Sequence, residues 1–316
     1  MARPLVIGSE RSEVALPTAT ALLAAGASAL DAVEAALMVC EDNLGDHYVG
    51  TGGLPNALGV VELDASVMIG STRAFGAVGA LKGFPHPISV ARAVLEQLPQ
   101  HCLLVGEGAE RFAEESGFSR TELLTEESRA MFLESLSVSP DSMEGERTAA
   151  SEGDQRYREA AMSLVRRFGR HDGPWGTINV IALDETGELC VGVSTSGYPF
   201  KYPGRIGDSA ICGAGNYCDL RHGGAACTGR GEMAMRVVGA RTIVDGIARG
   251  LEPGESCRAM LREAAALDDP FAAELRALAL CPDGRHGGAS GQAGSTYAVM
   301  QADDDGPQIF PRLVAN

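Results

Sequence analysis

A change in sequence character at Thr177 constrains the fold more than any other feature of this chain. From about Thr121 to Arg170 the residues are polar and charged, and few are large and apolar. This composition predicts an exposed, mobile linker that extends to about residue 176. From Thr177 the chain has two apolar runs separated by a turn at residues 184–187. We therefore expect a β-hairpin whose first strand begins at Thr177, directly after the linker.

Helices and strands are predicted on both sides of this hairpin. Helical periodicity and capping residues favour helices in four segments: 16–39 (one or two helices), 87–95, 230–251 and 253–267. Strand patterns mark residues 59–68, expected as a strand pair around a tight turn, and residues 295–300. Two groups of strands with helices outside them suggest a four-layer αββα sandwich in a single domain of residues 1–316, although periodicity alone supports only layered α/β.

Composition narrows the class of protein. Of 316 residues, 45% are hydrophobic, 40 are glycine and only 5% are aromatic, which indicates a tightly packed globular protein. The formal charge of −16 argues against nucleic acid and acidic membrane surfaces as partners. The apolar run near the N-terminus is too short for a signal peptide, and no stretch of about 18 apolar residues follows. We expect a cytoplasmic location.

The eight cysteines contain no C-x-x-C pair, which fits reduced and mostly buried thiols better than a disulfide framework. Four residues do cluster: Cys212, Cys218, His222 and Cys227. Their spacing differs from the usual pairing of zinc ligands, so we expect no metal site there.

Thr177 has the features of a self-activating nucleophile. A threonine hydroxyl needs an adjacent base, and an N-terminal threonine obtains one from its own α-amine. Gly176 removes side-chain crowding at the preceding bond, the linker tolerates a break, and the following strand would hold the hydroxyl rigidly. The alternative is that Thr177 merely opens a strand, as β-branched residues often do.

Arg205 and Asp208 form a second candidate constellation, because they lie three positions apart among glycines. An arginine can pair with an α-carboxylate while an aspartate accepts an ammonium group, which together would hold an amino acid with its side chain projecting toward a nucleophile. An ordinary surface ion pair is the alternative explanation.

The third constellation is the run of small residues from Ala225 to Glu232. It leads into a predicted helix and would present free backbone N–H groups toward negative charge, as an oxyanion hole does. Gly229 and Gly231 within it are candidate substrate-binding residues. A phosphate cradle or an ordinary helix entry would share this composition, but the spacings of phosphate-binding loops are absent.

Taken together, these segments resemble the asparaginase-like N-terminal-nucleophile hydrolases, and the glycosylasparaginase branch most closely. The N-terminal half carries the similarity in 29–34, 39–42, 63–66, 76–81, 87–92 and 103–109. The C-terminal half carries it, in the family's order, in 194–197, 204–209, 213–217 and 227–232.

The resemblance implies an αββα fold and a role for each matched residue. Thr177 would cut the chain after Gly176, giving an α subunit of residues 1–176 and a β subunit of 177–316, and would then attack a β-aspartyl amide. Thr195 would orient this nucleophile. The hydroxyl of Thr228 and the N–H of Gly229 would stabilise the oxyanion. Arg205 and Asp208 would hold the substrate's α-carboxylate and α-amino groups.

The resemblance further implies an enzyme that needs no metal or organic cofactor and that assembles as a dimer of αβ units. Three departures affect processing or substrate choice rather than the acyl chemistry. Gly173-Pro174-Trp175-Gly176 stands between His171-Asp172 and Thr177, the family's N-terminal tryptophan is replaced within 7–11, and Asn56-Ala57 replaces an acidic pair.

Several functions therefore remain open at the level of sequence. A glycosylasparaginase-like activity is favoured because 200–205 matches that branch best, and isoaspartyl peptidase or L-asparaginase activity is the alternative. From other classes, an uncleaved non-catalytic relative could bind an aspartyl ligand through Arg205 and Asp208, and a phosphate-binding protein could use the glycine-rich turns. The residues before Thr177 favour the first of these two, and the acidic charge argues against the second.

Overall fold

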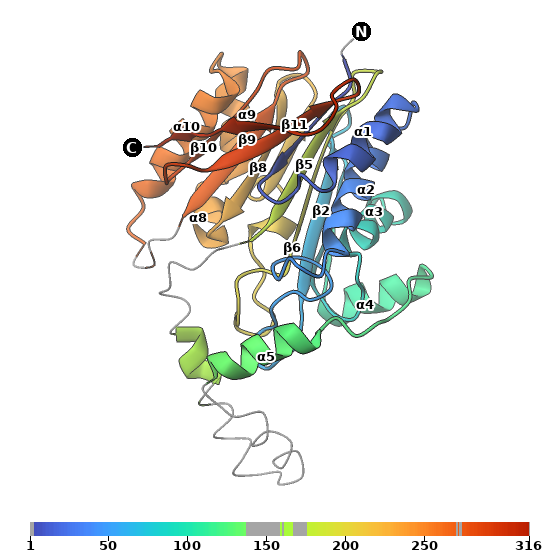
Figure 1. Cartoon of the computed structure of the whole chain (residues 1–316), viewed down its shortest axis with the longest axis vertical. Helices are drawn as coiled ribbons and strands as arrows, with labels where there is room; N and C mark the ends of the chain where they lie inside the picture. Colours follow the sequence, from blue (N-terminus) through green and yellow to red (C-terminus); the bar gives the residue numbers. More distant parts are fainter. Residues whose placement is uncertain are drawn as a thin grey trace.

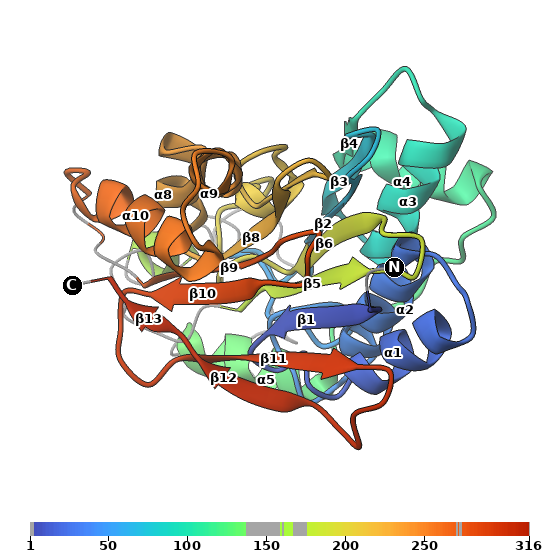
Figure 2. The same cartoon turned by 90° about the horizontal axis from the view of Figure 1, so that it is seen from above.

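The computed structural model describes residues 3–136, 159, 161–166, 176–269, 271 and 274–315. Two mixed β-sheets pack face to face between two layers of helices (Figures 1 and 2). The described strands of the larger sheet are, in spatial order, β12 (Gln308–Pro311), β11 (Thr296–Gln301), β1 (Leu5–Ser9), β5 (Ile178–Leu183), β6 (Leu189–Thr195), β2 (Leu63–Ile69), β3 (Phe75–Leu81) and β4 (Leu103–Val105). Those of the smaller sheet are β13 (Leu313–Val314), β10 (His286–Ser290), β9 (Leu275–Leu280), β8 (Gly223–Gly229) and β7 (Asn216–Asp219).

The helices cover the outer faces of both sheets. Those on the larger sheet are α1 (Leu16–Ala24), α2 (Ala29–Glu41) and α3 (Pro87–Gln97), with α4 (Gly106–Glu115) beside β3 and β4. Those on the smaller sheet are α9 (Gly239–Ala248) and α10 (Pro253–Ala265), with the short α8 (Gly231–Arg236) beside them. The four-layer αββα prediction is confirmed.

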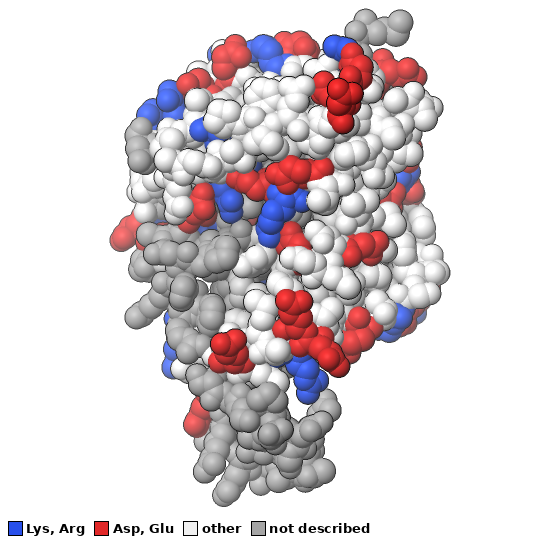
Figure 3. Space-filling view, viewed as in Figure 1, with Lys and Arg blue, Asp and Glu red and all other residues white. Residues whose placement is uncertain are grey.

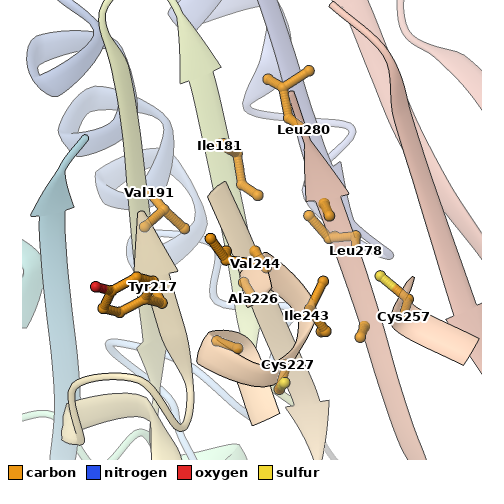
Figure 4. Packing of buried hydrophobic residues seen from close by; sticks show 14 of the residues in the cluster. Ile181, Val191, Tyr217, Ala226, Cys227, Ile243, Val244, Cys257, Leu278 and Leu280 are labelled. Carbon is orange, nitrogen blue, oxygen red and sulfur yellow. The ribbon is translucent and has the colours of Figure 1, made fainter. Parts of the chain in front are cut away.

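Strand β5 lies near the middle of the larger sheet and is buried on both faces. Because alternate side chains of a strand point to opposite faces, Val180 and Ala182 pack with the helices of the outer layer, whereas Ile181 packs toward the smaller sheet. Figure 4 shows Ile181 and Val191 of the larger sheet near Ala226 and Leu278 of the smaller sheet. Apolar side chains from both layers therefore surround the middle of β5.

Most of the predicted helices and strands are confirmed. Helix α2 was predictable because its sequence carries residues that cap a helix start. Ser28 and Asp31 form a capping box at its N-terminus, where each side chain bonds the other residue's backbone N–H. The predicted hairpin after Thr177 is β5–β6, in antiparallel register with Ile178 opposite Ser194.

One prediction near the strands is wrong. Residues 59–68 do not form a strand pair, because β2 begins only at Leu63 and pairs with β3 after a longer connection. The small-residue run from Ala225 leads into helix α8 at Gly231, as predicted, and its first five residues belong to strand β8.

The start of the predicted linker is also ordered. Helix α5 (Glu126–Ser135) occupies it, buries Phe132 and Leu133 in a small cluster with Leu54 and Phe200, and bonds Ser128 Oγ to the Gly52 carbonyl. The exposed-linker prediction is therefore wrong for 126–135. Most of the rest of that segment, including residues 167–175, lies outside the described residues.

Within the described part of the chain, no helix combines the length and hydrophobicity needed to span a bilayer. Figure 3 shows basic side chains interspersed with acidic ones on one face of the molecule, with no continuous basic patch on that face.

Candidate active site

Thr177 directly precedes β5 at the edge of the sandwich where β6 ends, because the antiparallel register sets Ile178 opposite Ser194. Its side chain is buried, and its backbone carbonyl accepts a hydrogen bond from Ser9 Oγ at 3.3 Å. A small pocket opens at this edge, and it is lined by Gly176, Thr177, Thr195, Gly197, Tyr198, Arg205, Gly207, Asp208, Ser209 and Gly229. Six residues predicted for the site from sequence therefore line one pocket.

Thr195, the last residue of β6, links the nucleophile candidate to the preceding peptide bond. Thr177 Oγ1 donates to Thr195 Oγ1 at 3.3 Å, and Thr195 Oγ1 donates to the Gly176 carbonyl oxygen at 2.8 Å. The N–H of Gly197 donates to the same hydroxyl at 2.9 Å and fixes its position. This arrangement polarises the Gly176 carbonyl beside the Thr177 hydroxyl, which could act as a nucleophile.

Gly176 is required by the space around it. A Cβ added there would lie 2.0 Å from Tyr48 Cβ and 2.6 Å from Arg11 Nη2. Tyr48 is itself held by the N–H of Ser196, which donates to its carbonyl at 2.7 Å. No residue with a side chain fits at position 176 unless this wall moves.

Arg205 presents one side of its guanidinium to the pocket. Its other side is engaged by Glu232, whose two carboxylate oxygens accept from Nε at 3.0 Å and from Nη2 at 2.9 Å. The ring of Tyr198 lies 4.3 Å from the guanidinium carbon. Cβ atoms added at Gly197 or Gly207 would lie 3.3 and 3.0 Å from Nη1, so these glycines leave room around the pocket side of the arginine.

Asp208 begins a short 3-10 helix (Asp208–Ala210) and is buried. Burial raises the pKa of its carboxyl to about 7, although the nearby Arg205 acts in the opposite direction. Its Oδ2 has no hydrogen-bond partner among the described residues. Gly231 permits this packing, because a Cβ there would lie 2.8 Å from both Asp208 N and Oδ1. Gly231 therefore adjoins the pocket without lining it.

Thr228 and Gly229 end β8. Gly229 has a φ of +121°, and a Cβ there would lie 2.2 Å from the Glu274 carbonyl oxygen, so the position needs glycine. The next N–H, of Arg230, donates to that same carbonyl at 3.1 Å. The predicted row of free N–H groups is thus wrong at Arg230.

Sequence reasoning missed four polar residues at the site: Tyr198 and Ser209, which line the pocket, and Glu232 and Asn179, which bond to other site residues. Glu232 lies in segment 227–232, but nothing in its spacing shows that it pairs with Arg205. Asn179 interrupts an apolar strand, and its side-chain amide donates to Thr228 Oγ1 at 2.6 Å. A polar residue within a predicted buried strand was the signal that could have identified it.

Comparison with known proteins places the chain in a family. The model of the asparaginase family matches residues 8–307. The N(4)-(beta-N-acetylglucosaminyl)-L-asparaginase of Mus musculus is 36% identical over 268 residues, which cover 82% of this chain and 76% of that protein. The Elizabethkingia miricola protein of the same name is 38% identical over 237 residues, 75% of this chain and 62% of the relative. The plant-type L-asparaginase of Pyrococcus furiosus is 37% identical over 235 residues, 74% of this chain and 72% of the relative. The chain belongs to the asparaginase family of amidohydrolases.

Proposed function

We propose that this protein cuts its own chain between Gly176 and Thr177 and then uses the N-terminal Thr177 to hydrolyse the β-amide of asparagine-type substrates. The observation that carries the proposal is the hydrogen-bonded series Thr177 Oγ1, Thr195 Oγ1 and Gly176 O, located in the same pocket as Arg205 and Asp208.

In the first reaction, Thr177 Oγ attacks the Gly176 carbonyl carbon, and the Gly176–Thr177 C–N bond breaks as the nitrogen takes a proton. Water then hydrolyses the resulting ester and releases residues 1–176 from 177–316. The donation from Thr195 to the Gly176 oxygen supports this step, because it stabilises negative charge that develops on that oxygen.

In the second reaction, the freed α-amine of Thr177 accepts the hydroxyl proton and Oγ attacks the substrate's side-chain amide carbon. Arg205 pairs with the α-carboxylate and Asp208 with the α-ammonium, which directs the β-amide toward Thr177. Thr228 Oγ1 and the N–H of Gly229 stabilise the oxyanion, and Gly231 lets Asp208 approach. The amine departs, and water hydrolyses the β-aspartyl ester.

The leaving group that we favour is the glycosylamine named for the Mus musculus and Elizabethkingia miricola relatives. The Pyrococcus furiosus relative is named for L-asparagine, so ammonia is the second candidate. A panel of glycosylasparagine, L-asparagine and β-aspartyl dipeptides, compared by kcat/KM, ranks them. We also propose assembly as a dimer of αβ units, which molar mass in solution tests.

The decisive experiment compares the intact mass of the wild-type protein with that of Thr177→Ala. We expect two fragments in the wild type, one beginning Thr-Ile-Asn-Val, and a single inactive chain in Thr177→Ala. Thr296→Ala is the matched control, because Thr296 begins another strand of the same sheet and does not line the pocket. It should be cut and active as the wild type is. A single wild-type chain with no amidase activity after long incubation would overturn the proposal.

A further inference from the structure

Asn179 is a buried amide in a strand that is otherwise apolar from Ile178 to Leu183. Because side chains two positions apart on a strand share a face, Asn179 projects to the same side as Thr177. Its side chain crosses from the larger sheet to β8 of the smaller sheet, where it meets Cys227 and Thr228.

The hydrogen bonds of this amide fix its orientation. Nδ2 lies 3.0 Å from the Cys227 carbonyl oxygen and 2.6 Å from Thr228 Oγ1. A carbonyl oxygen can only accept, so the group that faces it must be the NH₂ and not the amide oxygen. The two protons of Nδ2 therefore serve these two acceptors, one each.

This orientation determines what the Thr228 hydroxyl can do. A hydroxyl has one proton to donate and two lone pairs that accept. Since Thr228 Oγ1 accepts from Asn179, its own proton is directed elsewhere. The end of β8 at which Thr228 lies continues into Gly229, which lines the pocket beside Thr177.

Stability does not explain an asparagine here. Its Oδ1 is buried and has no hydrogen-bond partner among the described residues. An unpartnered buried oxygen destabilises the folded state relative to an apolar side chain of similar size. The residue is better explained by what its NH₂ does to Thr228.

We infer that Asn179 is a positioning residue that makes the Thr228 hydroxyl a hydrogen-bond donor to the oxyanion formed when Thr177 attacks the substrate. The inference rests on the proposed function and adds a residue to it. Asn179 touches neither substrate nor nucleophile in this role, so its effect passes entirely through Thr228.

The test is a double-mutant cycle of Asn179→Ala and Thr228→Ala, with kcat expressed per free Thr177 N-terminus counted by N-terminal sequencing. Loss of the oxyanion donor in Thr228→Ala should lower kcat roughly 100- to 1000-fold. Asn179→Ala should lower it roughly 10- to 100-fold with KM changed by less than about twofold, because the interaction exists only in the transition state. The double variant should match Thr228→Ala alone.

Asn179→Asp keeps the size of the side chain, so it tests the inference even if Asn179→Ala folds poorly. The oxygen that replaces Nδ2 carries at most one proton, which the Cys227 carbonyl would take, so this oxygen would accept from Thr228 and draw its proton away from the oxyanion. We expect kcat to fall at least as far as in Asn179→Ala.

Asn216 supplies the matched control. It is buried, its Nδ2 donates to Ser66 Oγ at 2.7 Å across the same two sheets, and its Oδ1 has no partner among the described residues. Any loss in Asn216→Ala should multiply with that of Thr228→Ala.

The outcomes distinguish failure of the positioning role of Asn179 from failure of the proposed function. If the losses in Asn179→Ala and Thr228→Ala multiply, or Asn179→Ala changes only KM, the positioning role is overturned and the hydrolase stands. If Thr228→Ala leaves kcat unchanged, the oxyanion assignment itself fails and the inference fails with it.

Discussion

Asp208 holds a buried carboxylate whose Oδ2 lacks a partner among the described residues, beside a guanidinium that already binds Glu232. Burial of a carboxylate without full hydrogen bonding is unfavourable, which is why the pKa of Asp208 rises to about 7. Such groups concentrate at sites where a ligand completes the bonding. A substrate ammonium would supply the missing partner.

The pH dependence of kcat/KM should report this group. Below about pH 7 the carboxyl of Asp208 is protonated and cannot pair with an ammonium, so kcat/KM falls as pH falls. The α-amine of Thr177 must also be unprotonated, and amines of this kind titrate near pH 8. The acid limb of log kcat/KM against pH should therefore approach a slope of about 2.

Asp208→Asn isolates the two ionisations. It should lower kcat/KM about 100-fold and reduce the acid slope to about 1, because only the amine still titrates. An unchanged slope in Asp208→Asn would assign the second ionisation to another group.

At the residue scale, the sequence predicted pairs of site residues that are close together in the chain. Arg205 and Asp208 are three positions apart, so one loop brings both of them to the pocket. Glu232 is 27 positions from Arg205, and Asn179 is 49 from Thr228. Those pairs depend on how the two sheets face each other, which no local pattern encodes.

At the scale of elements, the β5–β6 hairpin is tied to α2 by Asp184. Its Oδ1 accepts from Thr186 N at 2.9 Å, from Thr186 Oγ1 at 2.6 Å and from Glu188 N at 3.0 Å, which closes the turn. Its Oδ2 accepts from Ala29 N at 3.0 Å, in the first turn of α2, where the helix favours negative charge. One buried carboxylate thus links the strand that follows Thr177 to the outer helix layer.

Asp184→Ala should lower the free energy of unfolding by about 2 to 3 kcal/mol, because it removes both the turn and the helix-terminal contact. Urea denaturation in a Thr177→Ala background, where the chain stays intact, measures this. Asp283→Ala is the matched control: Asp283 Oδ1 accepts from Arg285 N at 3.1 Å in an exposed turn between β9 and β10. It should change the free energy by less than about 1 kcal/mol. Equal losses would contradict the anchoring role of Asp184.

The elements of the smaller sheet show where prediction from sequence fails. Strand β8 reads Gly-Gly-Ala-Ala-Cys-Thr-Gly and β10 reads His-Gly-Gly-Ala-Ser. Few of these residues have intrinsic β preference, so the strands form because small side chains fit between the larger sheet and helices α9 and α10. The β5–β6 hairpin, in contrast, is rich in Val and Ile and was predicted with its turn.

At the scale of the whole molecule, Glu41 connects helix α2, to which it belongs, with helix α3 and strand β6. It ends α2 and is fully buried. Its Oε1 accepts from Ser194 Oγ of β6 at 2.6 Å and from Ile88 N of α3 at 3.2 Å. Its Oε2 lies 3.4 Å from His86 Nδ1. Burial raises the pKa of Glu41 to about 7, and the neighbouring Glu41 carboxyl raises the pKa of His86. The layered architecture could be predicted from the sequence, but this buried junction could not, because its members come from three separate segments.

The Glu41 junction should make stability depend on pH in a defined direction. The unfolded chain releases the Glu41 proton near the usual pKa of 4.5, whereas the folded protein keeps it to about 7. The folded state therefore binds more protons between these values, so stability is highest below about pH 4.5 for this group and declines as pH rises through 7. The raised pKa of His86 acts in the same sense. Asp42 and Glu34 also face His86 and strengthen its charged form.

Glu41→Gln removes the titrating carboxyl and keeps an oxygen that accepts from Ser194 and Ile88. Between pH 4.5 and pH 8, the free energy of unfolding of Thr177→Ala should fall by roughly 2 to 3 kcal/mol more than that of the same protein with Glu41→Gln. Urea denaturation of the two uncut proteins measures this difference.

Ser194→Ala gives a second test of the junction. Its hydroxyl lowers the pKa of Glu41, so its removal should move the decline in stability to higher pH. Identical pH profiles for Thr177→Ala with and without Glu41→Gln would show that the pKa of Glu41 is the same in the folded and unfolded states. The junction of the three segments would then contribute no pH dependence to the free energy of unfolding.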